Sequence, residues 1–291
     1  MAAAGGGAGR IRGALAAAVT PLRDGGTRLD DAAFAPYMDF LVEGGVDGIL
    51  ALGTTGEGVL LSVEERRRAL RLVLDGVAGR LPVIAHCGAQ STADTAVLAA
   101  DAAEQGAAAV AVIAPPYYAF GDDEQLAHLQ AAARACAPLP FYAYEFAARS
   151  GYAVAPATIA RLREACSNVA GIKVSDTPAD AVRPYLADGL DVFVGAETLL
   201  AEIPQAAGTV SGLGAVFPEV VAGVLRDPAG PDAARAARLR PLLAGRFPQV
   251  AKALLGARGL PVLGDVRAPL LPLREDERAA VAAAYRATLE G

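Results

Sequence analysis

The chain has 291 residues, 54% of them hydrophobic, which is enough for one large α/β domain or two small ones with a sizeable core. Its formal net charge of -6 argues against a nucleic-acid-binding protein, which needs a concentrated basic face. No window approaches about 18 consecutive strongly apolar residues, and the first ten residues carry neither a basic region nor a long apolar core, so we expect no membrane span and no export signal.

Cysteine and histidine content narrows the class further. Cys87, Cys136 and Cys166 lie far apart without a CxxC pair, so we expect no disulfide framework and a reducing, cytoplasmic location. His86 and His128 are the only histidines, which is too few for a histidine-rich metal site, and no DxD-like cluster suggests a carboxylate site. We therefore expect no bound metal.

Short apolar runs alternate with segments of helical periodicity after residues 1–10, which we expect to be a disordered leader. The eight runs span residues 13–22, 48–53, 81–88, 107–116, 139–146, 169–175, 190–196 and 208–214. They are nearly continuous, as expected for parallel strands that are covered on one face and packed on the other. Eight strand–helix units predict a (β/α)8 TIM barrel over residues 11–225.

The helical pattern is clearest after the second run. Apolar side chains recur there on one helix face, at Leu70, Val73, Leu74 and Val77. Ser62 and Glu65 form the sequence pattern of a capping box, which predicts that the helix begins at this point.

Residues 226–291 follow the eighth unit and contain further helical patterns, preceded by prolines such as Pro231 and Pro272. We expect a helical C-terminal extension packed on the barrel, without a catalytic site of its own. The alternative fold is a doubly wound open sheet, which normally carries a GxGxxG turn after its first strand, and none is present.

The C-terminal strand ends of such a barrel line its active site. The polar and reactive residues at these ends are Thr20, Thr54, Thr55, Glu57, His86, Cys87, Tyr117, Tyr118, Tyr144, Glu145, Lys173, Ser175, Asp176, Glu197 and Ser211. Lys173 is the only lysine among them, and the whole chain has only two lysines among 26 Lys and Arg residues. Burial lowers the pKa of a lysine by up to about 3 to 5 units, which gives the neutral amine that Schiff-base formation needs. The alternative is an ion pair between Lys173 and a carboxylate such as Asp176.

The turn GTTGEG after the second run offers an anion site. Free backbone N–H groups and the hydroxyls of Thr54 and Thr55 suit a carboxylate or phosphate oxygen. An ordinary tight turn is the alternative interpretation.

Tyr144 closes the fifth run, next to the strand of Lys173. A phenol beside an amine can carry protons while a carbinolamine forms and collapses. The alternative is that this aromatic side chain only packs.

Four motifs in order resemble the dihydrodipicolinate synthase and N-acetylneuraminate lyase family: GTTGE, PPYY, Tyr144 at a strand end and GIK on the sixth strand. The resemblance covers residues 11–225, and the helical tail is also similar. It implies a class I lyase or synthase that uses pyruvate or another 2-keto acid together with an aldehyde. It also places a covalent imine with the substrate on Lys173, so we expect no bound cofactor.

The resemblance also implies roles for the other matching residues. Thr54 and Thr55, with Gly53 in the same turn, match the segment that holds the pyruvate carboxylate. Tyr144 matches a proton-relaying tyrosine that is hydrogen-bonded to Thr54. Tyr118 matches a tyrosine that completes the relay from a neighbouring subunit, which implies a homodimer or homotetramer.

Departures from the family pattern bear on the second substrate. Arg149 matches the arginine that binds the carboxylate of aspartate semialdehyde in the synthases, although a loop salt bridge is the alternative. Glu145 replaces an amide there, which weakens the synthase interpretation. His86 stands where the synthases carry a small residue, as a second acid or base or as a polar filler. Glu197 favours a hydroxylated 2-keto acid, and Ser211 joins it in the expected substrate-binding set.

Three hypotheses remain open. The first is a lyase or aldolase that releases pyruvate from a hydroxylated 2-keto acid. The second is the synthase of lysine biosynthesis, 4-hydroxy-tetrahydrodipicolinate synthase, which condenses pyruvate with aspartate semialdehyde. The third is a non-catalytic sensor of 2-keto acids, which loses ground because the lysine, the tyrosines and the threonines are all present.

Overall fold

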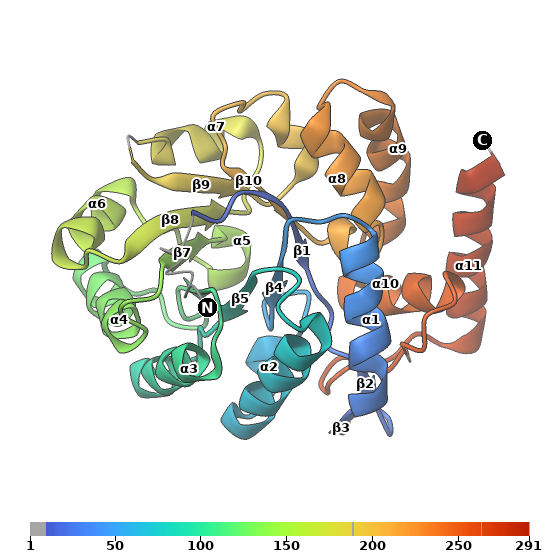
Figure 1. Cartoon of the computed structure of the whole chain (residues 1–291), viewed down its shortest axis with the longest axis horizontal. Coiled ribbons are helices and arrows are strands. Elements are labelled where there is room, and N and C mark those ends of the chain that lie inside the picture. Colours follow the sequence, from blue (N-terminus) through green and yellow to red (C-terminus); the bar gives the residue numbers. More distant parts are fainter. Residues whose placement is uncertain (1–9, 188, 263, 291) are drawn as a thin grey trace, which may run out of the picture.

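Eight parallel strands form a closed barrel in the computed structural model, which describes residues 10–187, 189–262 and 264–290 (Figure 1). The first of the eight strands pairs with both the second and the last, which closes the sheet. The strands are β1 Gly13–Ala17, β4 Gly48–Ala51, β5 Val83–His86, β6 Ala109–Ile113, β7 Phe141–Glu145, β8 Val169–Val174, β9 Asp191–Val194 and β10 Gly208–Ser211. Each predicted apolar run contains one of them, so the (β/α)8 barrel is confirmed and the open sheet is excluded. All but the last residue of the expected leader lies outside the described residues.

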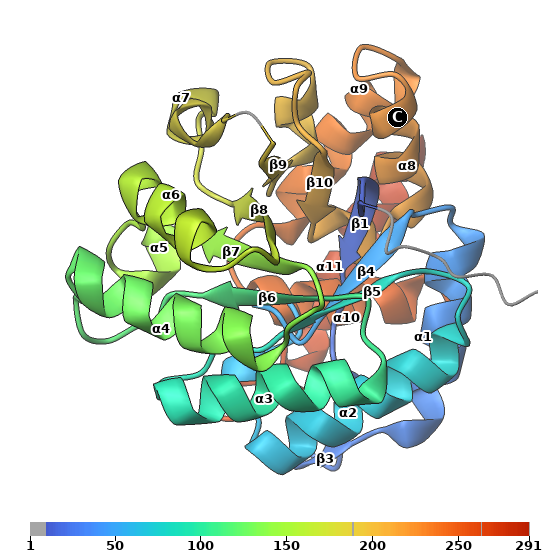
Figure 2. The ribbon, with the colours of Figure 1, turned by 60° about the vertical axis from the view of Figure 1, so that its left-hand side comes forward.

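Helices follow the strands along the chain and cover the outside of the barrel. Figure 2 shows α1 to α4 side by side around one half of it. The helices between the strands and directly after β10 are α1 Asp31–Glu43, η1 Gly58–Leu60, α2 Val63–Val77, α3 Thr92–Gln105, α4 Asp122–Ala135, α5 Ala147–Ser150, α6 Pro156–Ala165, α7 Ala179–Val182, η2 Arg183–Tyr185, η3 Glu197–Leu200, η4 Leu213–Ala215 and α8 Pro218–Arg226. The predicted capping box of α2 is confirmed, since Ser62 Oγ accepts a hydrogen bond from the backbone N–H of Glu65 and the Glu65 side chain accepts one from the N–H of Ser62.

The first apolar run is longer than its strand, because β1 ends at Ala17. Pro21 has no N–H to donate to a strand ladder, and the chain then reverses through Gly25 and Gly26, both with positive φ. Two short strands, β2 Leu22–Arg23 and β3 Arg28–Leu29, pair across this reversal. Strands of two residues carry no sequence period, so they were not predicted.

Side chains fill the barrel interior below the C-terminal ends of the strands. Tyr142 on β7 and Phe193 on β9 meet edge to face, with ring centroids 5.8 Å apart. Gly171 on β8 lies opposite Tyr142, and a Cβ there would stand 2.1 Å from the Asp191 carbonyl oxygen and 2.7 Å from the Tyr142 ring. Side chains alternate along a strand, so Tyr144 and Lys173, two residues further along β7 and β8, point the same way as Tyr142 and Gly171. The filled interior therefore forms the floor of the space into which Lys173 projects.

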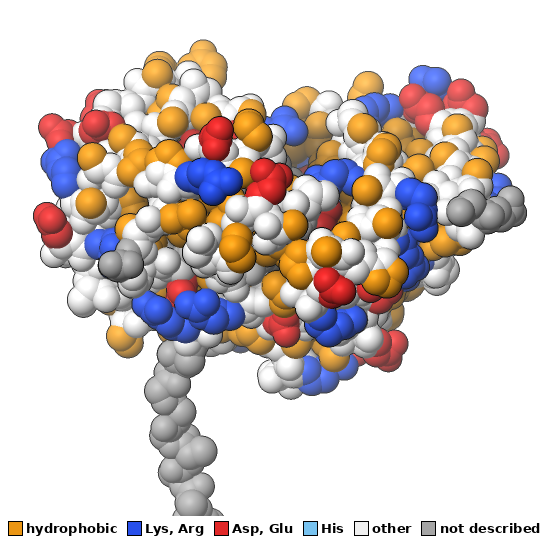
Figure 3. Space-filling model, turned by 90° about the horizontal axis from the view of Figure 1, so that it is seen from above, with side chains coloured by type: hydrophobic (Ala, Val, Ile, Leu, Met, Phe, Trp, Pro, Cys, Tyr) orange, Lys and Arg blue, Asp and Glu red, His pale blue; other side chains and the backbone are white. Residues whose placement is uncertain are grey.

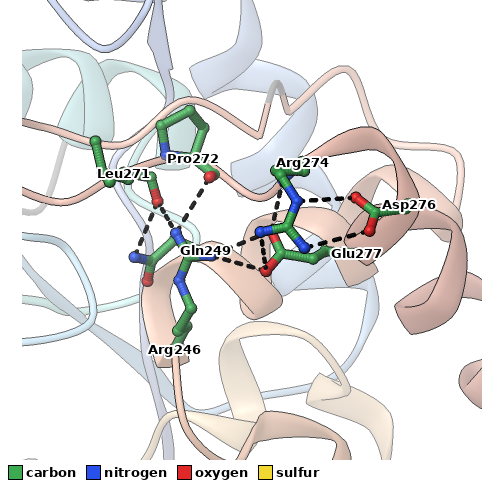
Figure 4. Close-up of polar contacts among 7 residues, drawn as sticks. All are labelled: Arg246, Gln249, Leu271, Pro272, Arg274, Asp276 and Glu277. Atoms are coloured by element: carbon green, nitrogen blue, oxygen red, sulfur yellow. Dashed lines mark hydrogen bonds and ion pairs between the residues drawn. The ribbon is translucent and has the colours of Figure 1, made fainter.

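The C-terminal region is helical and returns across the barrel. It consists of α9 Pro231–Leu239, η5 Arg240–Leu243, α10 Phe247–Ala257 and α11 Glu275–Glu290. Figure 4 shows Arg246 and Gln249 at the start of α10 binding the carbonyl of Leu271, and Arg246 reaching Glu277 of α11 at 3.2 Å. These bonds tie the segment after η5 to the last helix. The division of the chain at residue 225 stays a prediction.

Other expectations concern the surface and the cysteines. All three cysteines are buried free thiols. Within residues 10–187, 189–262 and 264–290, no helix is long and apolar enough to cross a membrane, and no group of three or more His, Cys, Asp or Glu side chains could hold a metal ion. The face in Figure 3 mixes basic and acidic side chains with many apolar ones and shows no large basic area.

Candidate active site

Lys173 lies near the C-terminal end of β8, directly across from Tyr144 on β7. Its Nζ donates a hydrogen bond to Ser175 Oγ at 2.7 Å and stands 3.7 Å from the centre of the Tyr144 ring. In the described part of the chain no carboxylate lies within ion-pair distance of Nζ. Asp176, the suggested partner, instead accepts a hydrogen bond from the N–H of Ala147 at 2.8 Å. The amine is therefore held by a hydroxyl and an aromatic face.

The Tyr144 phenol is the centre of a hydroxyl cluster. Its oxygen lies 3.4 Å from both Thr54 Oγ1 and Ser175 Oγ. Burial alone would raise the pKa of Tyr144, but the Lys173 ammonium and the hydrogen bonds from Lys173, Ser175 and Thr54 outweigh it, so this pKa lies below its usual value. A phenol with a lowered pKa and two hydroxyl neighbours has what a proton relay requires.

The GTTGEG turn brings Thr54 to this cluster. Glu57 has a positive φ of 56°, and the N–H of Gly58 donates to the carbonyl of Gly53 at 3.3 Å. A Cβ at Gly58 would stand 1.9 Å from the Leu52 carbonyl oxygen, so glycine is required there. The tight folding of this turn leaves Thr54 and Thr55 facing the open end of the barrel.

A buried ion pair anchors the same turn to the C-terminal extension. Lys252 of α10 has a fully buried side chain, and its Nζ lies 2.6 Å from Glu57 Oε1 and donates to the Asp265 carbonyl at 2.7 Å. The other Glu57 oxygen accepts the N–H of Arg267 at 2.7 Å. Glu57 was expected at a strand end, but its binding to the second lysine of the chain was not predicted from the sequence.

A cavity of about 610 Å³ opens above Lys173. Its polar lining includes Thr54, Thr55, Tyr144 and Ser175, and its cationic lining consists of Lys173, Arg149 and Arg240. No Asp or Glu is among the described residues that line it. The C-terminal extension supplies one side of the cavity through Ala237, Arg240, Pro241, Leu243, Ala244, Gly245 and Phe247. The volume falls in the usual range for small-molecule sites.

Arg149 stands at the edge of this cavity on α5, the short helix after β7. Its guanidinium lies 5.7 Å from the centre of the Phe146 ring. Among the described residues it has no ion-pair partner, so the alternative of a loop salt bridge has no support here. The arginine is free to bind an anion from the cavity.

Two carboxyl groups, those of the buried Glu145 and the half-buried Asp176, fix the segment that carries Arg149. Glu145 accepts a hydrogen bond from the N–H of Val154 at 2.7 Å, and Asp176 accepts one from Ala147. Burial, helped by the nearby Asp176 and opposed by the bond from Val154, raises the pKa of Glu145 to about 7. Glu145 thus points back into the protein and supports the loop.

Glu197 and Ser211 lie side by side, outside the lining of the cavity. Glu197 is 0% exposed, one of its oxygens accepts the Ser211 hydroxyl at 2.6 Å, and the other accepts Arg240 Nη2 at 2.6 Å. Arg240 is the member of this trio that reaches the cavity. No sequence pattern pointed to Arg240, because only the fold brings it to a carboxylate 43 positions away.

His86 lines a second cavity of about 410 Å³, which shares Thr54 and Arg149 with the first. Its Nε2 accepts a long hydrogen bond from the N–H of Ile113 at 3.4 Å, while Nδ1 has no partner in the described residues. Burial, with the positive charges of Arg66 and Lys173, lowers the pKa of His86 to about 3. A neutral ring argues against an acid role near pH 7.

Tyr118 does not reach the site within its own chain. Its side chain is 66% exposed and packs edge to face on Tyr117, which is more exposed still and has a φ of 90°. Two neighbouring exposed tyrosines leave an aromatic pair free for contact with another molecule.

Ser175 has a role that the sequence analysis left unassigned. It accepts from Lys173 and donates to Tyr144, so it connects the two central groups. Its position two residues after Lys173 on the same face was the available signal.

Comparisons with known proteins agree with this geometry. Residues 10–288 match the Dihydrodipicolinate synthetase family. The chain is 33% identical to a 4-hydroxy-tetrahydrodipicolinate synthase of Syntrophus aciditrophicus over 92% of its own length and 95% of the relative's. It is 34% identical to an uncharacterized DapA-like lyase of Halobacterium salinarum, over 89% and 88% of the two chains. A solved structure of YagE, a prophage protein of the dihydrodipicolinic acid synthase family from E. coli K12 in complex with pyruvate, is similar with a TM-score of 0.86 and 26% identity over 96% of this chain and 99% of that one.

Proposed function

The chain belongs to the dihydrodipicolinate synthetase family of class I aldolase-type lyases, and we propose that Lys173 is the residue that forms the Schiff base with pyruvate. The observation that carries the proposal is the Nζ of Lys173, free of any carboxylate in the described residues, against the Tyr144 ring and the Ser175 hydroxyl at the floor of a cavity. An unpaired amine in contact with proton carriers is the arrangement that imine chemistry requires.

The proposed reaction begins when Lys173, after losing a proton, attacks the keto carbon of pyruvate with its amine. The carbinolamine loses water to give the imine, which withdraws electrons from the adjacent methyl group. A proton leaves that methyl, and the resulting enamine attacks the carbonyl carbon of the aldehyde, whose oxygen takes up a proton. The attack re-forms an imine to Lys173, and water hydrolyses it to release the product and the free amine. The reverse sequence breaks the carbon–carbon bond and releases pyruvate. The mechanism needs no further cofactor, because the imine itself accepts the electron pair.

Thr54 and Thr55 are the proposed binding site for the pyruvate carboxylate. Both line the cavity, and the turn that carries them is fixed by bonds to Gly53 and Glu57. Hydroxyls and backbone N–H groups held in advance lose little entropy when an anion binds. A carboxylate bound there would place the keto carbon of pyruvate near Lys173 Nζ.

Tyr144 is the proposed acid and base of the sequence. Its contacts with Thr54 and Ser175 give it two routes for a proton, and its lowered pKa eases the loss of its own. The exposed Tyr118 supports a homodimer or homotetramer in which a neighbouring subunit completes the relay. The free thiols support a cytoplasmic location.

Arg149 is the proposed ligand for a carboxylate on the aldehyde. Aspartate semialdehyde, the second substrate of the synthase reaction, carries such a carboxylate, so the role of Arg149 bears on whether this chain catalyses that reaction. Replacing Arg149 by Ala should raise the KM for an aldehyde acid by about 10 to 100-fold, because a charge-assisted hydrogen bond is lost. The KM for pyruvate should change little, and Arg149→Lys should recover part of the loss.

The experiment is steady-state kinetics of both variants with pyruvate and a panel of aldehydes. An equal effect of Arg149→Ala on every aldehyde, charged or not, would contradict carboxylate recognition. A folded wild-type protein that neither turns over any aldehyde nor forms a pyruvate adduct would instead favour the 2-keto acid sensor.

A further inference from the structure

The cavity carries positive charge at two places beyond Lys173. Arg149 comes from the segment after β7 and Arg240 from η5, which packs beside the segment after β9. β8, the strand of Lys173, lies between β7 and β9 in the barrel. The described lining holds three cations and no carboxylate, which favours an anionic ligand.

Arg240 is fixed in place from beneath. Its Nε and Nη2 both donate to one oxygen of the buried Glu197, at 3.0 and 2.6 Å, and the other oxygen accepts from Ser211. Ser211 Oγ in turn accepts the N–H of Leu213 at 3.1 Å. A guanidinium held at two of its nitrogens is oriented before any ligand arrives.

The third nitrogen of Arg240 is left for a ligand. The side chain is 41% exposed, lines the cavity, and makes no hydrogen bond from Nη1 within the described part of the chain. The sequence analysis expected the Glu197 carboxylate to meet hydroxyls of the substrate. The structure presents a guanidinium at this position instead, which reverses the polarity of the group that faces the ligand.

On the basis of the proposed function, we infer that Arg240 is a specificity-determining residue. It binds a further anionic group, a carboxylate or a phosphate, on the aldehyde half of the substrate, in addition to the carboxylate assigned to Arg149. Because Arg240 belongs to the C-terminal extension, this extension takes part in substrate selection. An uncharged or only hydroxylated aldehyde gains less from Nη1, because the bond to it is not charge-assisted.

The test uses two variants and a matched control. Arg240→Gln combined with Glu197→Gln removes both charges and leaves no buried carboxylate unpaired. Arg240→Lys keeps an ion pair with Glu197 but lacks the free Nη1. Arg238→Gln, an exposed arginine of α9 that does not line the cavity, is the control.

The readout is the KM, at saturating pyruvate, for aldehydes of equal length that all carry the carboxylate assigned to Arg149. They differ only in a further terminal group, which is a carboxylate, a phosphate or a hydroxyl. In both Arg240 variants we expect the KM for the better anionic aldehyde to rise about 10 to 100-fold and that for the hydroxyl aldehyde to change less than about twofold. Arg238→Gln should match the wild type. The anionic aldehyde whose KM rises more, the carboxylate or the phosphate, identifies the group that Arg240 binds.

Two outcomes separate this inference from the function on which it rests. Equal changes for aldehydes with a charged and with an uncharged terminal group, in a variant that still forms the pyruvate adduct, would overturn the Arg240 subsite alone. A wild-type protein that forms no pyruvate adduct would overturn the proposed function and the inference together.

Discussion

The two lysines of the chain lie in opposite surroundings. Lys173 contacts a hydroxyl and an aromatic ring and faces an open cavity, whereas the side chain of Lys252 is fully buried against Glu57 and a backbone carbonyl. Burial lowers the pKa of Lys252, and the Glu57 carboxylate opposes that shift. Arginine supplies the positive charge on the surface of this chain, and both lysines make their contacts inside the protein. Only the unpaired one is placed to react.

The two lysines also meet through one turn. Glu57, the partner of Lys252, follows Thr54 by three residues, and Thr54 lies 3.4 Å from the Tyr144 oxygen beside Lys173. The buried ion pair thus helps to hold the turn on which the reactive site depends. Changes at Lys173 should therefore affect chemistry, and changes at Lys252 should affect stability first.

Lys173→Ala should have the largest effect on the reaction. Without the amine no imine forms, so turnover should fall to background while the fold is kept. Kinetics, together with the circular dichroism spectrum and the thermal midpoint, check both statements. Substantial activity in a folded Lys173→Ala protein would rule out the imine mechanism.

Tyr144→Phe should lower kcat by about 10² to 10⁴, the usual contribution of a general acid or base. Tyr142→Phe is the matched control, because Tyr142 lies on the same face of the same strand but below the cavity, with a hydroxyl that has no partner in the described residues. A near-normal rate for Tyr144→Phe would remove the phenol from the relay.

Lys252→Met should lower the free energy of unfolding by about 3 to 5 kcal/mol, because it leaves the buried Glu57 carboxylate unpaired. Adding Glu57→Gln should restore part of the loss, since Gln can still accept from the N–H of Arg267. Urea denaturation of the single and double variants measures the difference. A single variant as stable as the wild type would show that the ion pair adds no stability.

Glu145 extends the comparison to a buried carboxyl group that has no cation partner in the described residues. Its pKa of about 7 in the folded protein lies above the ordinary value of 4.5, so the folded state binds the proton more tightly than the unfolded state. Stability from this group is present at low pH and is lost as the pH rises from 4.5 through about 7. Over that window the wild type should lose about 1 to 3 kcal/mol more than Glu145→Gln, by the conversion of about 1.36 kcal/mol per pKa unit. Denaturant unfolding at a series of pH values gives the difference, and parallel pH curves for the two proteins would contradict it.

The sequence predicted the parts of the molecule that depend on local pattern. Eight apolar runs and the capping box led to the barrel and to the start of α2, and the strand-end rule led to Lys173, Tyr144 and Thr54. The contacts of Arg240 and Lys252 could not be predicted in this way. They join side chains that are distant in the chain and adjacent only after the C-terminal extension has folded over the barrel.

Glu197 shows the same limit at a single residue. Its place after the seventh strand of the barrel suggested contact with substrate, but strand-end position does not say which neighbour will cover a side chain. In the folded protein Ser211 and Arg240 take both of its oxygens.

Borohydride reduction in the presence of pyruvate, followed by peptide mapping, tests the central claim most directly. The two lysines fall on different peptides after cleavage at arginine, since Arg226 and Arg246 lie between them. The account predicts one reduced pyruvate adduct, on the peptide that holds Lys173, and none on the peptide that holds Lys252. An adduct on Lys252, or no adduct on a folded protein, would contradict it.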